Sequence, residues 1–191
     1  MKKYFPVILF VLTFTGFLSG QIIFDLFNLS AGLSSKEKAI NVHYQNLFSK
    51  INLKTSDNND LKLSKIKAPI VILNFWASWC KPCLEEFPTI VAMKKKFSND
   101  QVLVIGINAD EKNQNIKIKK IVKKYNLNFP IVADKDGKAL KDFLISSLPV
   151  SIIFKNGKVI EISKVAKDFN SGEVITSFQK ILKNSKKNIN I

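Results

Sequence analysis

The chain contains two cysteines, Cys80 and Cys83, which are separated by Lys81 and Pro82. They follow an apolar run and precede a segment with helical spacing, so we expect Cys80 at the amino terminus of a helix. Free N–H groups and the helix dipole there lower the pKa of a thiol. Lys81 adds a nearby positive charge, and Pro82 suits the first helical turn because its missing N–H costs nothing there. The pattern predicts a thiolate that attacks the disulfide of a partner.

The spacing of the two cysteines favours redox chemistry over other roles. Residues i and i+3 share a helix face and lie within the roughly 4.4–6.8 Å Cα separation that a disulfide needs. Cys83 could therefore resolve a mixed disulfide formed by Cys80. A purely structural disulfide across two residues would constrain almost nothing. Two cysteines and the single histidine, His43, do not make a four-ligand zinc site, so we expect neither a metal nor a cofactor.

The segments that must position the pair alternate between strand and helix. Residues 69–76 and 102–108 are continuous apolar runs, typical of strands buried on both faces. Residues 82–97 and 115–125 have helical spacing. This alternation predicts an α/β fold with a mixed central sheet and helices on both faces. The remaining predicted elements are a strand at 129–133, a short helix ending at Phe143, strands at 150–154 and 158–164 around an Asn156-Gly157 turn, and a helix at 173–182.

The amino terminus carries a membrane signal. Lys2 and Lys3 precede an uncharged run from Tyr4 to Phe24, and about 20 apolar residues cross the hydrocarbon core as a helix. The two lysines favour a cytoplasmic amino terminus, with the rest of the chain outside. We expect an uncleaved signal anchor over residues 1–29, because the run is long and Leu18-Ser19-Gly20 is a poor cleavage site. A cleaved signal peptide is the alternative.

Composition sets the remaining boundaries and excludes some partners. We expect a juxtamembrane linker at 30–50, one domain at 51–184 and a polar tail at 185–191. The 191-residue chain has a net charge of +15 and contains no arginine. Its lysines are scattered, and arginine is the residue that contacts phosphate and guanine in a bidentate way, so we expect no nucleic-acid partner. The lysines of residues 117–124 could form a docking face for an acidic partner, but the solvated side of a helix is the favoured interpretation.

The cysteine segment resembles a known family. Asn74-Phe75-Trp76-Ala77-Ser78-Trp79-Cys80-Lys81-Pro82-Cys83 is similar to the active-site segment of thioredoxin-fold proteins. The continuation Leu84-Glu85-Glu86-Phe87-Pro88 and the segments 106–108, 129–134 and 147–150 resemble the membrane-anchored TlpA/ResA-like branch. The similarity covers residues 50–182 and implies a thioredoxin-like domain.

The resemblance also implies a function and a place for it. Members of this branch are thiol–disulfide oxidoreductases that reduce disulfides in exported proteins such as apocytochrome c. A membrane electron-donor thiol protein recharges them. The chain would then be held by its amino-terminal anchor, with the catalytic domain at the periplasmic face of a bacterial inner membrane.

The resemblance assigns a substrate-binding surface. Pro149 matches the family's cis proline, which faces the disulfide, whereas a simple loop proline is the alternative. The backbone beside this proline holds an extended substrate segment in the family, so Leu148 is a candidate contact. Trp79, next to Cys80, is expected on the same surface.

Proton transfer is the last role that the resemblance implies. Asn74 stands where cytoplasmic thioredoxins carry a buried aspartate, so that proton acceptor is missing. Glu86 matches a glutamate of the ResA-like branch and shares a helix face with Cys83. Partial burial would raise its pKa and let it take the proton of Cys83. A solvated helix glutamate, which Glu85 resembles, is the alternative.

Three other functions remain open at this point. A disulfide-forming oxidant or isomerase would use the same chemistry, and the Lys-Pro pair between the cysteines does not decide the direction. A non-catalytic binding or chaperone module would hold a partner through the surface of Trp79 and Pro149. A peroxidase of the same superfold is disfavoured, because it would carry Pro and Thr or Ser where this chain has Leu73 and Ala77.

Overall fold

The central sheet has five strands in the order β5-β4-β3-β6-β7, in a computed structural model that describes residues 35–187. The strands are β3 (Ile70–Trp76), β4 (Val102–Asn108), β5 (Ile131–Ala133), β6 (Val150–Lys155) and β7 (Lys158–Ser163). β4 runs parallel to β3, and β5 runs parallel to β4. β6 is antiparallel to both β3 and β7. The predicted mixed sheet is confirmed.

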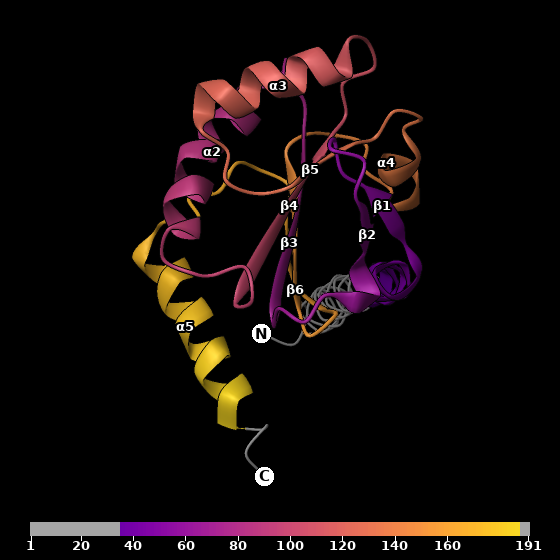
Figure 1. The fold of residues 1–191 in the computed structure, drawn as a ribbon. Helices are drawn as coiled ribbons and strands as arrows, with labels where there is room; N and C mark the ends of the chain where they lie inside the picture. The colour runs from indigo at the N-terminus through magenta and orange to yellow at the C-terminus, as the bar shows by residue number, and fades with distance from the viewer. Residues whose placement is uncertain (1–34, 188–191) are drawn as a thin grey trace, which may run out of the picture. The chain divides into compact units, whose positions relative to one another are not determined.

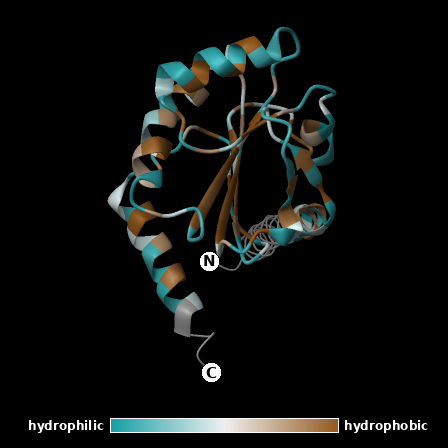
Figure 2. Ribbon diagram, viewed as in Figure 1, coloured by the Kyte–Doolittle hydropathy of each residue, from teal (hydrophilic) through white to brown (hydrophobic). Residues whose placement is uncertain are grey.

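Helices cover both faces of this sheet, as the alternating pattern predicts (Figure 1). One face packs against α2 (Lys81–Lys94), α3 (Gln114–Tyr125) and α5 (Gly172–Lys187), with which it forms a single apolar cluster. The other face carries the short helix α4 (Lys138–Asp142), followed by Phe143, whose ring contacts Phe75 of β3. Figure 2 shows the strands between these layers as the most continuously hydrophobic part of the described chain.

Strand β3 decides which side chains meet the cysteine helix. All of its residues are buried, and successive side chains point to opposite faces of the sheet. Ile72 and Trp76 belong to the cluster formed with α2, whereas Phe75 contacts Phe143 on the opposite face. Asn74 has the same parity as Ile72 and Trp76, so its amide lies on the α2 face. A polar side chain is thereby placed beneath the helix that bears the cysteines.

The unit that contains the sheet begins earlier than the sequence predicts. Residues 35–50 are helical, and the compact unit starts at Tyr44 rather than at residue 51. The ring of Tyr44 lies 5.6 Å from that of Phe143, and the ring of Phe48 lies 4.7 Å from that of Phe154. These aromatic contacts bury Tyr44 and Phe48, which the sequence assigns to a linker. Local sequence patterns do not reveal these contacts, because the partner residues lie about a hundred residues away along the chain.

Two smaller features complete the fold. A short hairpin of β1 (Asn52–Lys54) and β2 (Asp60–Lys62) precedes the sheet and leads into a 3-10 turn, η2 (Leu63–Lys65). α5 continues to Lys187, beyond the predicted end at residue 182 and into the predicted polar tail. Within residues 35–187, no helix is both long enough and apolar enough to cross a membrane. The predicted span from Tyr4 to Phe24 lies outside this range.

Candidate active site

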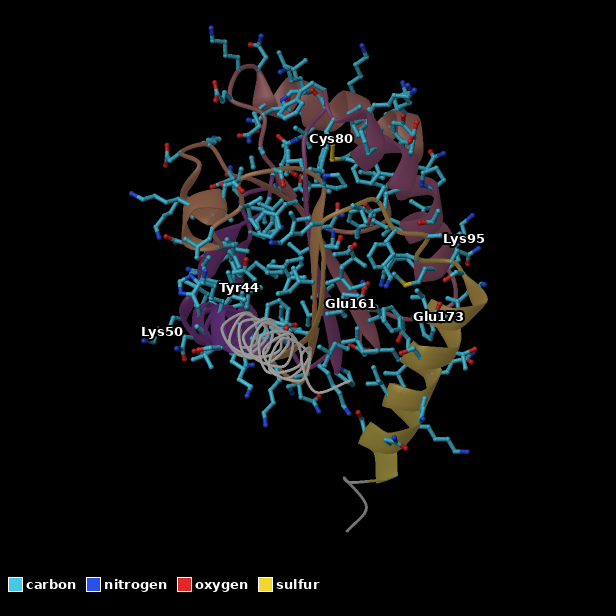
Figure 3. All side chains as sticks on the ribbon, turned by 180° about the vertical axis from the view of Figure 1, so that it is seen from behind. Tyr44, Lys50, Cys80, Lys95, Glu161 and Glu173 are labelled. Carbon is cyan, nitrogen blue, oxygen red and sulfur yellow. A yellow bond between two sulfur atoms is a disulfide. The ribbon has the colours of Figure 1, made fainter. Side chains whose placement is uncertain are left out.

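The two cysteines form a disulfide where β3 passes into α2. Cys80 is the N-cap of α2, and the backbone N–H of Cys83 donates to Cys80 Sγ over 3.3 Å. Their Cα atoms are 5.3 Å apart, which fits the predicted pair on one helix face. Figure 3 shows Cys80 at one end of the sheet. A sulfur at a helix N-cap lies against free N–H groups, and this position favours the thiolate once the disulfide opens.

The surroundings of the disulfide differ sharply in exposure. Cys80 and Cys83 are 4% and 1% exposed, whereas the neighbouring Trp79 is 69% exposed. The Leu148–Pro149 peptide bond is cis, as the resemblance implies. Pro149 is buried, and Leu148 is half-buried against the apolar cluster that includes both cysteines. Leu148 and the cysteines thus belong to one packed region, although they are far apart in the sequence.

The two residues between the cysteines are both exposed. Lys81 Nζ lies 3.8 Å from Glu85 Oε1, with most of each side chain in water. An exposed ion pair of this kind contributes little. Pro82 occupies the first turn of α2, as predicted. Lys81 therefore presents its charge to solvent beside the disulfide, where an incoming partner would meet it.

Glu86 lies one helical turn after Cys83 and is 2% exposed. The strand register places Asn74 of β3 opposite Ser151 of β6, and both side chains reach the carboxyl group. Ser151 Oγ donates to Glu86 Oε1 over 3.3 Å, and Asn74 Nδ2 approaches Oε1 to 3.4 Å and Ser151 Oγ to 3.0 Å. Glu86 Oε2 has no hydrogen-bond partner within the described part of the chain.

This environment favours a protonated carboxyl group. Burial raises the pKa of Glu86 to about 8, despite the opposing effects of the Ser151 hydroxyl and of Lys167. The hydrogen bonds that Glu86 accepts are long and come from neutral groups, so they compensate little of the lost hydration. The predicted rise in pKa is confirmed, and the alternative of a solvated Glu86 is wrong.

Two polar residues near the site escape the sequence reasoning. Ser151 is the one hydroxyl in the apolar strand Val150–Lys155, a signal that the sequence does show. Asp110 follows the buried strand β4, and its carboxylate accepts hydrogen bonds from the backbone N–H and the hydroxyl of Ser78, two residues before Cys80. An acidic residue just beyond the carboxyl end of a buried parallel strand was the available signal, because that edge of the sheet also carries the cysteines.

Comparisons with known proteins agree with this geometry. The AhpC/TSA family model matches residues 45–162. The thiol-disulfide oxidoreductase ResA of Bacillus cereus is 35% identical over 147 residues, which are 75% of this chain and 80% of that protein. ResA of Bacillus subtilis is 33% identical over 111 residues, which are 58% of this chain and 61% of that relative. The latter alignment spans less than two thirds of the relative.

A solved structure extends the likeness to three dimensions. The crystal structure of StoA from Bacillus subtilis matches with a TM-score of 0.55 and 25% identity, over 69% of this chain and 94% of that one. The family match includes β3, the cysteines, Glu86 and Pro149 within one continuous stretch. These similarities show that the chain belongs to the AhpC/TSA family of thioredoxin-like proteins, among its thiol–disulfide oxidoreductases.

Proposed function

We propose that the chain is an extracytoplasmic reductant of disulfides in exported proteins, acting through the Cys80–Cys83 dithiol. The observation that carries this proposal is the pairing of an N-cap cysteine with a buried carboxyl group one turn beyond its partner cysteine. The first feature supports a nucleophilic thiolate, and the second supports a proton acceptor for the other thiol. The described structure is the oxidised protein, which is the product of the proposed reaction.

The reaction transfers two electrons in two exchanges. The Cys80 thiolate attacks one sulfur of the substrate disulfide, which forms a mixed disulfide and releases the other substrate sulfur as a thiolate. The Cys83 thiolate then attacks Cys80 Sγ, which releases the second substrate thiolate and closes the Cys80–Cys83 disulfide. The substrate is reduced by two electrons, and this protein is oxidised by two.

Only the ionised form of Glu86 can accept the proton of Cys83 in the second exchange, and the share of this form grows as the pH rises toward the Glu86 pKa. Its pKa of about 8 lies close to the ordinary thiol pKa of about 8.5, which suits proton transfer between the two groups. Because the oxidised protein favours protonated Glu86 at neutral pH, the proton can stay on the carboxyl group after the disulfide closes. We expect Glu86→Gln to slow the second exchange and to leave the attack of Cys80 largely unchanged.

The substrate is a protein segment that lies along the cis-proline loop. The exposed ring of Trp79, next to Cys80, and the half-buried Leu148, which packs against the apolar cluster that includes both cysteines, supply apolar surface near the disulfide, and Pro149 directly follows Leu148. Apocytochrome c is the exported substrate that the family resemblance favours. A membrane electron-donor thiol protein would reduce the Cys80–Cys83 disulfide again, and residues 1–29 would anchor the chain with the catalytic unit at the periplasmic face.

The reduction potential of the full chain tests the direction of electron flow. The protein is equilibrated with dithiol–disulfide buffers, and the fraction of reduced Cys80 is measured. A potential near the ~−270 mV of thioredoxin supports a reductant. A potential near the ~−120 mV of the strongest oxidants of this fold would overturn the proposed direction and favour the disulfide-forming alternative.

Trapping the intermediate tests the chemistry itself. A Cys83→Ser variant is expected to accumulate a mixed disulfide with a substrate protein, because the resolving thiol is gone. Cys80→Ser is the control and should trap nothing. Full reductase activity in the Cys80→Ser variant would contradict the proposal and favour a non-catalytic binding or chaperone module.

A further inference from the structure

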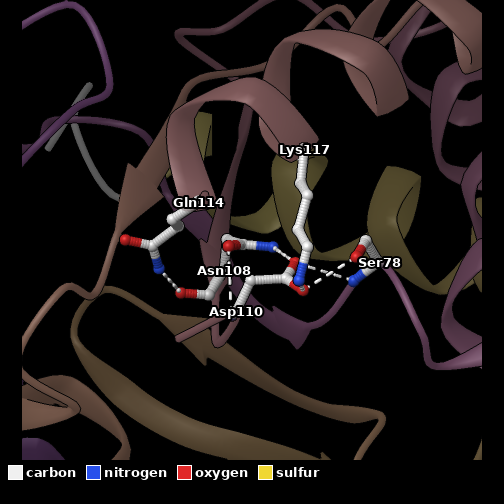
Figure 4. A network of polar contacts seen from close by, with 5 residues as sticks. All are labelled: Ser78, Asn108, Asp110, Gln114 and Lys117. Carbon is white, nitrogen blue, oxygen red and sulfur yellow. Dashed lines mark hydrogen bonds and ion pairs between the residues drawn. The ribbon is translucent and has the colours of Figure 1, made fainter. Parts of the chain in front are cut away.

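We propose that Asp110 is a positioning residue that ties the active-site loop to α3 through Ser78 and Lys117, and so holds Cys80 at the N-cap of α2. This inference rests on the proposed function, because the loop in question carries the attacking thiol. Asp110 lies just after β4, and Lys117 lies on the second turn of α3. Figure 4 shows both Lys117 and Ser78 directed at the Asp110 carboxylate.

The carboxylate of Asp110 is fully hydrogen-bonded. Oδ2 accepts from the Ser78 backbone N–H and from Asn108 Nδ2, each over 2.8 Å. Oδ1 accepts from Ser78 Oγ over 2.7 Å and from Lys117 Nζ over 2.9 Å. The Asp110 side chain is completely buried, whereas that of Lys117 is 37% exposed. Four short bonds to one buried carboxylate fix its position, and they fix Ser78 by both its backbone and its side chain.

The residues around Asp110 are also held by hydrogen bonds. Asn108 Oδ1 accepts from the Asp110 backbone N–H over 3.1 Å, so the two side chains support each other. Gln114, at the start of α3, donates from Nε2 to the Asn108 carbonyl over 2.9 Å. The connection therefore runs from the end of β4 and the first two turns of α3 to Ser78.

Besides the helical hydrogen bond from the Leu84 N–H to the Cys80 carbonyl over 3.2 Å, two backbone hydrogen bonds hold the loop between β3 and α2. The Ala109 N–H donates to the Trp76 carbonyl over 2.8 Å, and the Cys80 N–H donates to the Ala77 carbonyl over 3.1 Å. The first bond holds the end of β3, and the second lies within the loop. Ser78 is the residue of the loop that Asp110 binds from outside it. When the disulfide opens, the side-chain cross-link between Cys80 and Cys83 disappears, and the bonds to Ser78 still hold the loop.

The charge of Asp110 is matched to this role. Burial would raise its pKa, but hydrogen bonds from Asn108, Ser78 and Lys117 together outweigh burial and lower it. The group is therefore ionised wherever thiol–disulfide exchange takes place. A buried carboxylate needs its charged partner, and removal of Lys117 would leave it poorly compensated.

Three variants of the reduced full chain test the inference. They are Asp110→Asn, Lys117→Gln and Ser78→Ala. The control is Lys120→Gln on the exposed face of α3, because it removes a positive charge from the same helix as Lys117→Gln does. The readouts are the pKa of the Cys80 thiol, taken from the pH dependence of its alkylation, and kcat/KM for a disulfide peptide. We expect all three variants to raise the thiol pKa, and Asp110→Asn to lower kcat/KM about tenfold, because small misplacement of a reacting group costs rate. Lys120→Gln should leave the thiol pKa unchanged.

Charge alone predicts a different pattern. Removing the negative charge of Asp110 would lower the pKa of a nearby thiol, whereas removing the positive charge of Lys117 would raise it. Opposite shifts in these two variants would overturn positioning and favour a direct field effect. A lower melting temperature with an unchanged thiol pKa in all three would also overturn it, because that result indicates a merely structural role. Ser78→Ala keeps the bond from its backbone N–H, so it serves if Asp110→Asn does not fold.

The same measurements separate this inference from the proposed function. If the wild-type chain fails to reduce the peptide but the three variants still raise the Cys80 pKa, the proposed function is wrong and the positioning role stands. If the wild-type chain is active and the pKa of the Cys80 thiol is unchanged in all three variants, the positioning role is wrong and the proposed function stands.

Discussion

Two carboxyl groups near the disulfide have pKa values shifted in opposite directions. Glu86 is buried against long hydrogen bonds from neutral partners, and burial raises its pKa to about 8. Asp110 is also buried, but four short bonds, one of them from an ammonium group, lower its pKa. Carboxyl groups whose pKa values are shifted in opposite directions perform different tasks within one site. Glu86 can exchange a proton near neutral pH, whereas Asp110 keeps its charge and holds the loop.

The buried Glu86 predicts how stability depends on pH. Its folded-state pKa of about 8 lies above the ordinary glutamate pKa of 4.5, so the folded protein binds more protons than the unfolded chain between these two values. The free energy of unfolding should therefore fall as the pH rises through this window and level off above about pH 8. Glu86→Gln should flatten this slope. Urea denaturation of the oxidised protein across the window measures the difference, and the disulfide keeps the cysteines from titrating.

The neighbouring Glu85 provides the matched control for this experiment. Glu85 is exposed and lies on the same helix, so Glu85→Gln removes the same charge without removing a buried acid. We expect this variant to keep the wild-type slope. Equal slopes for the wild type and Glu86→Gln would show that Glu86 ionises in the folded state as it does in the unfolded chain, contrary to its observed burial.

At the scale of the elements, local signals predict well and distant pairings do not. β3 and β4 are continuous apolar runs, and the observed Asn156-Gly157 turn has the positive φ angles of a tight hairpin. The Cys80–Cys83 pair could likewise be singled out from its spacing within one helix, whereas Glu86 is suggested by the family resemblance together with its i, i+3 spacing to Cys83. The contribution of Ser151 depends on the register of β6 against β3, and that of Asp110 on a loop over thirty residues away. No local pattern encodes such pairings.

The close approach of β4 to its neighbours gives a prediction at this scale. A Cβ atom on Gly106 would lie 2.6 Å from Ile131 Cδ1, 3.1 Å from Trp76 Nε1 and 3.2 Å from Phe129 Cε2. The side chains there must move to accept even a methyl group, so we expect Gly106→Ala to destabilise the protein by about 1–3 kcal/mol. Urea denaturation of the full chain measures the loss.

Gly172 supplies the comparison for this substitution. It begins α5, and a Cβ atom there would meet nothing within 4 Å. Gly172→Ala should leave stability unchanged or raise it slightly, because alanine favours the helix. Equal denaturation midpoints for Gly106→Ala and the wild type would mean that the contacts around Gly106 relax without cost.

At the scale of the whole molecule, basic residues outnumber acidic residues. The chain carries a net charge of +15. α3, which reaches the active-site loop through Lys117, contains no acidic residue. Four of its lysines are exposed, namely Lys119, Lys120, Lys123 and Lys124. Like charges one turn apart on a helix repel one another and slightly destabilise it. These charges lie on the helix that is tied to the active-site loop through Lys117 and Asp110, so we expect a positive field at the approach to Cys80.

Such a field should act on the rate of encounter with charged substrates. We expect kcat/KM for an acidic disulfide peptide to fall as ionic strength rises from about 0.01 to about 0.15 M, because the screening length shortens from about 30 to about 8 Å. A basic peptide with the same disulfide and length should show the opposite dependence, while kcat stays constant for both. Steering acts before the chemical step, which explains why only kcat/KM should respond. Equal salt dependence for the two peptides would show that the positive field does not reach the approach to Cys80, and α3 would then be only the solvated side of the fold.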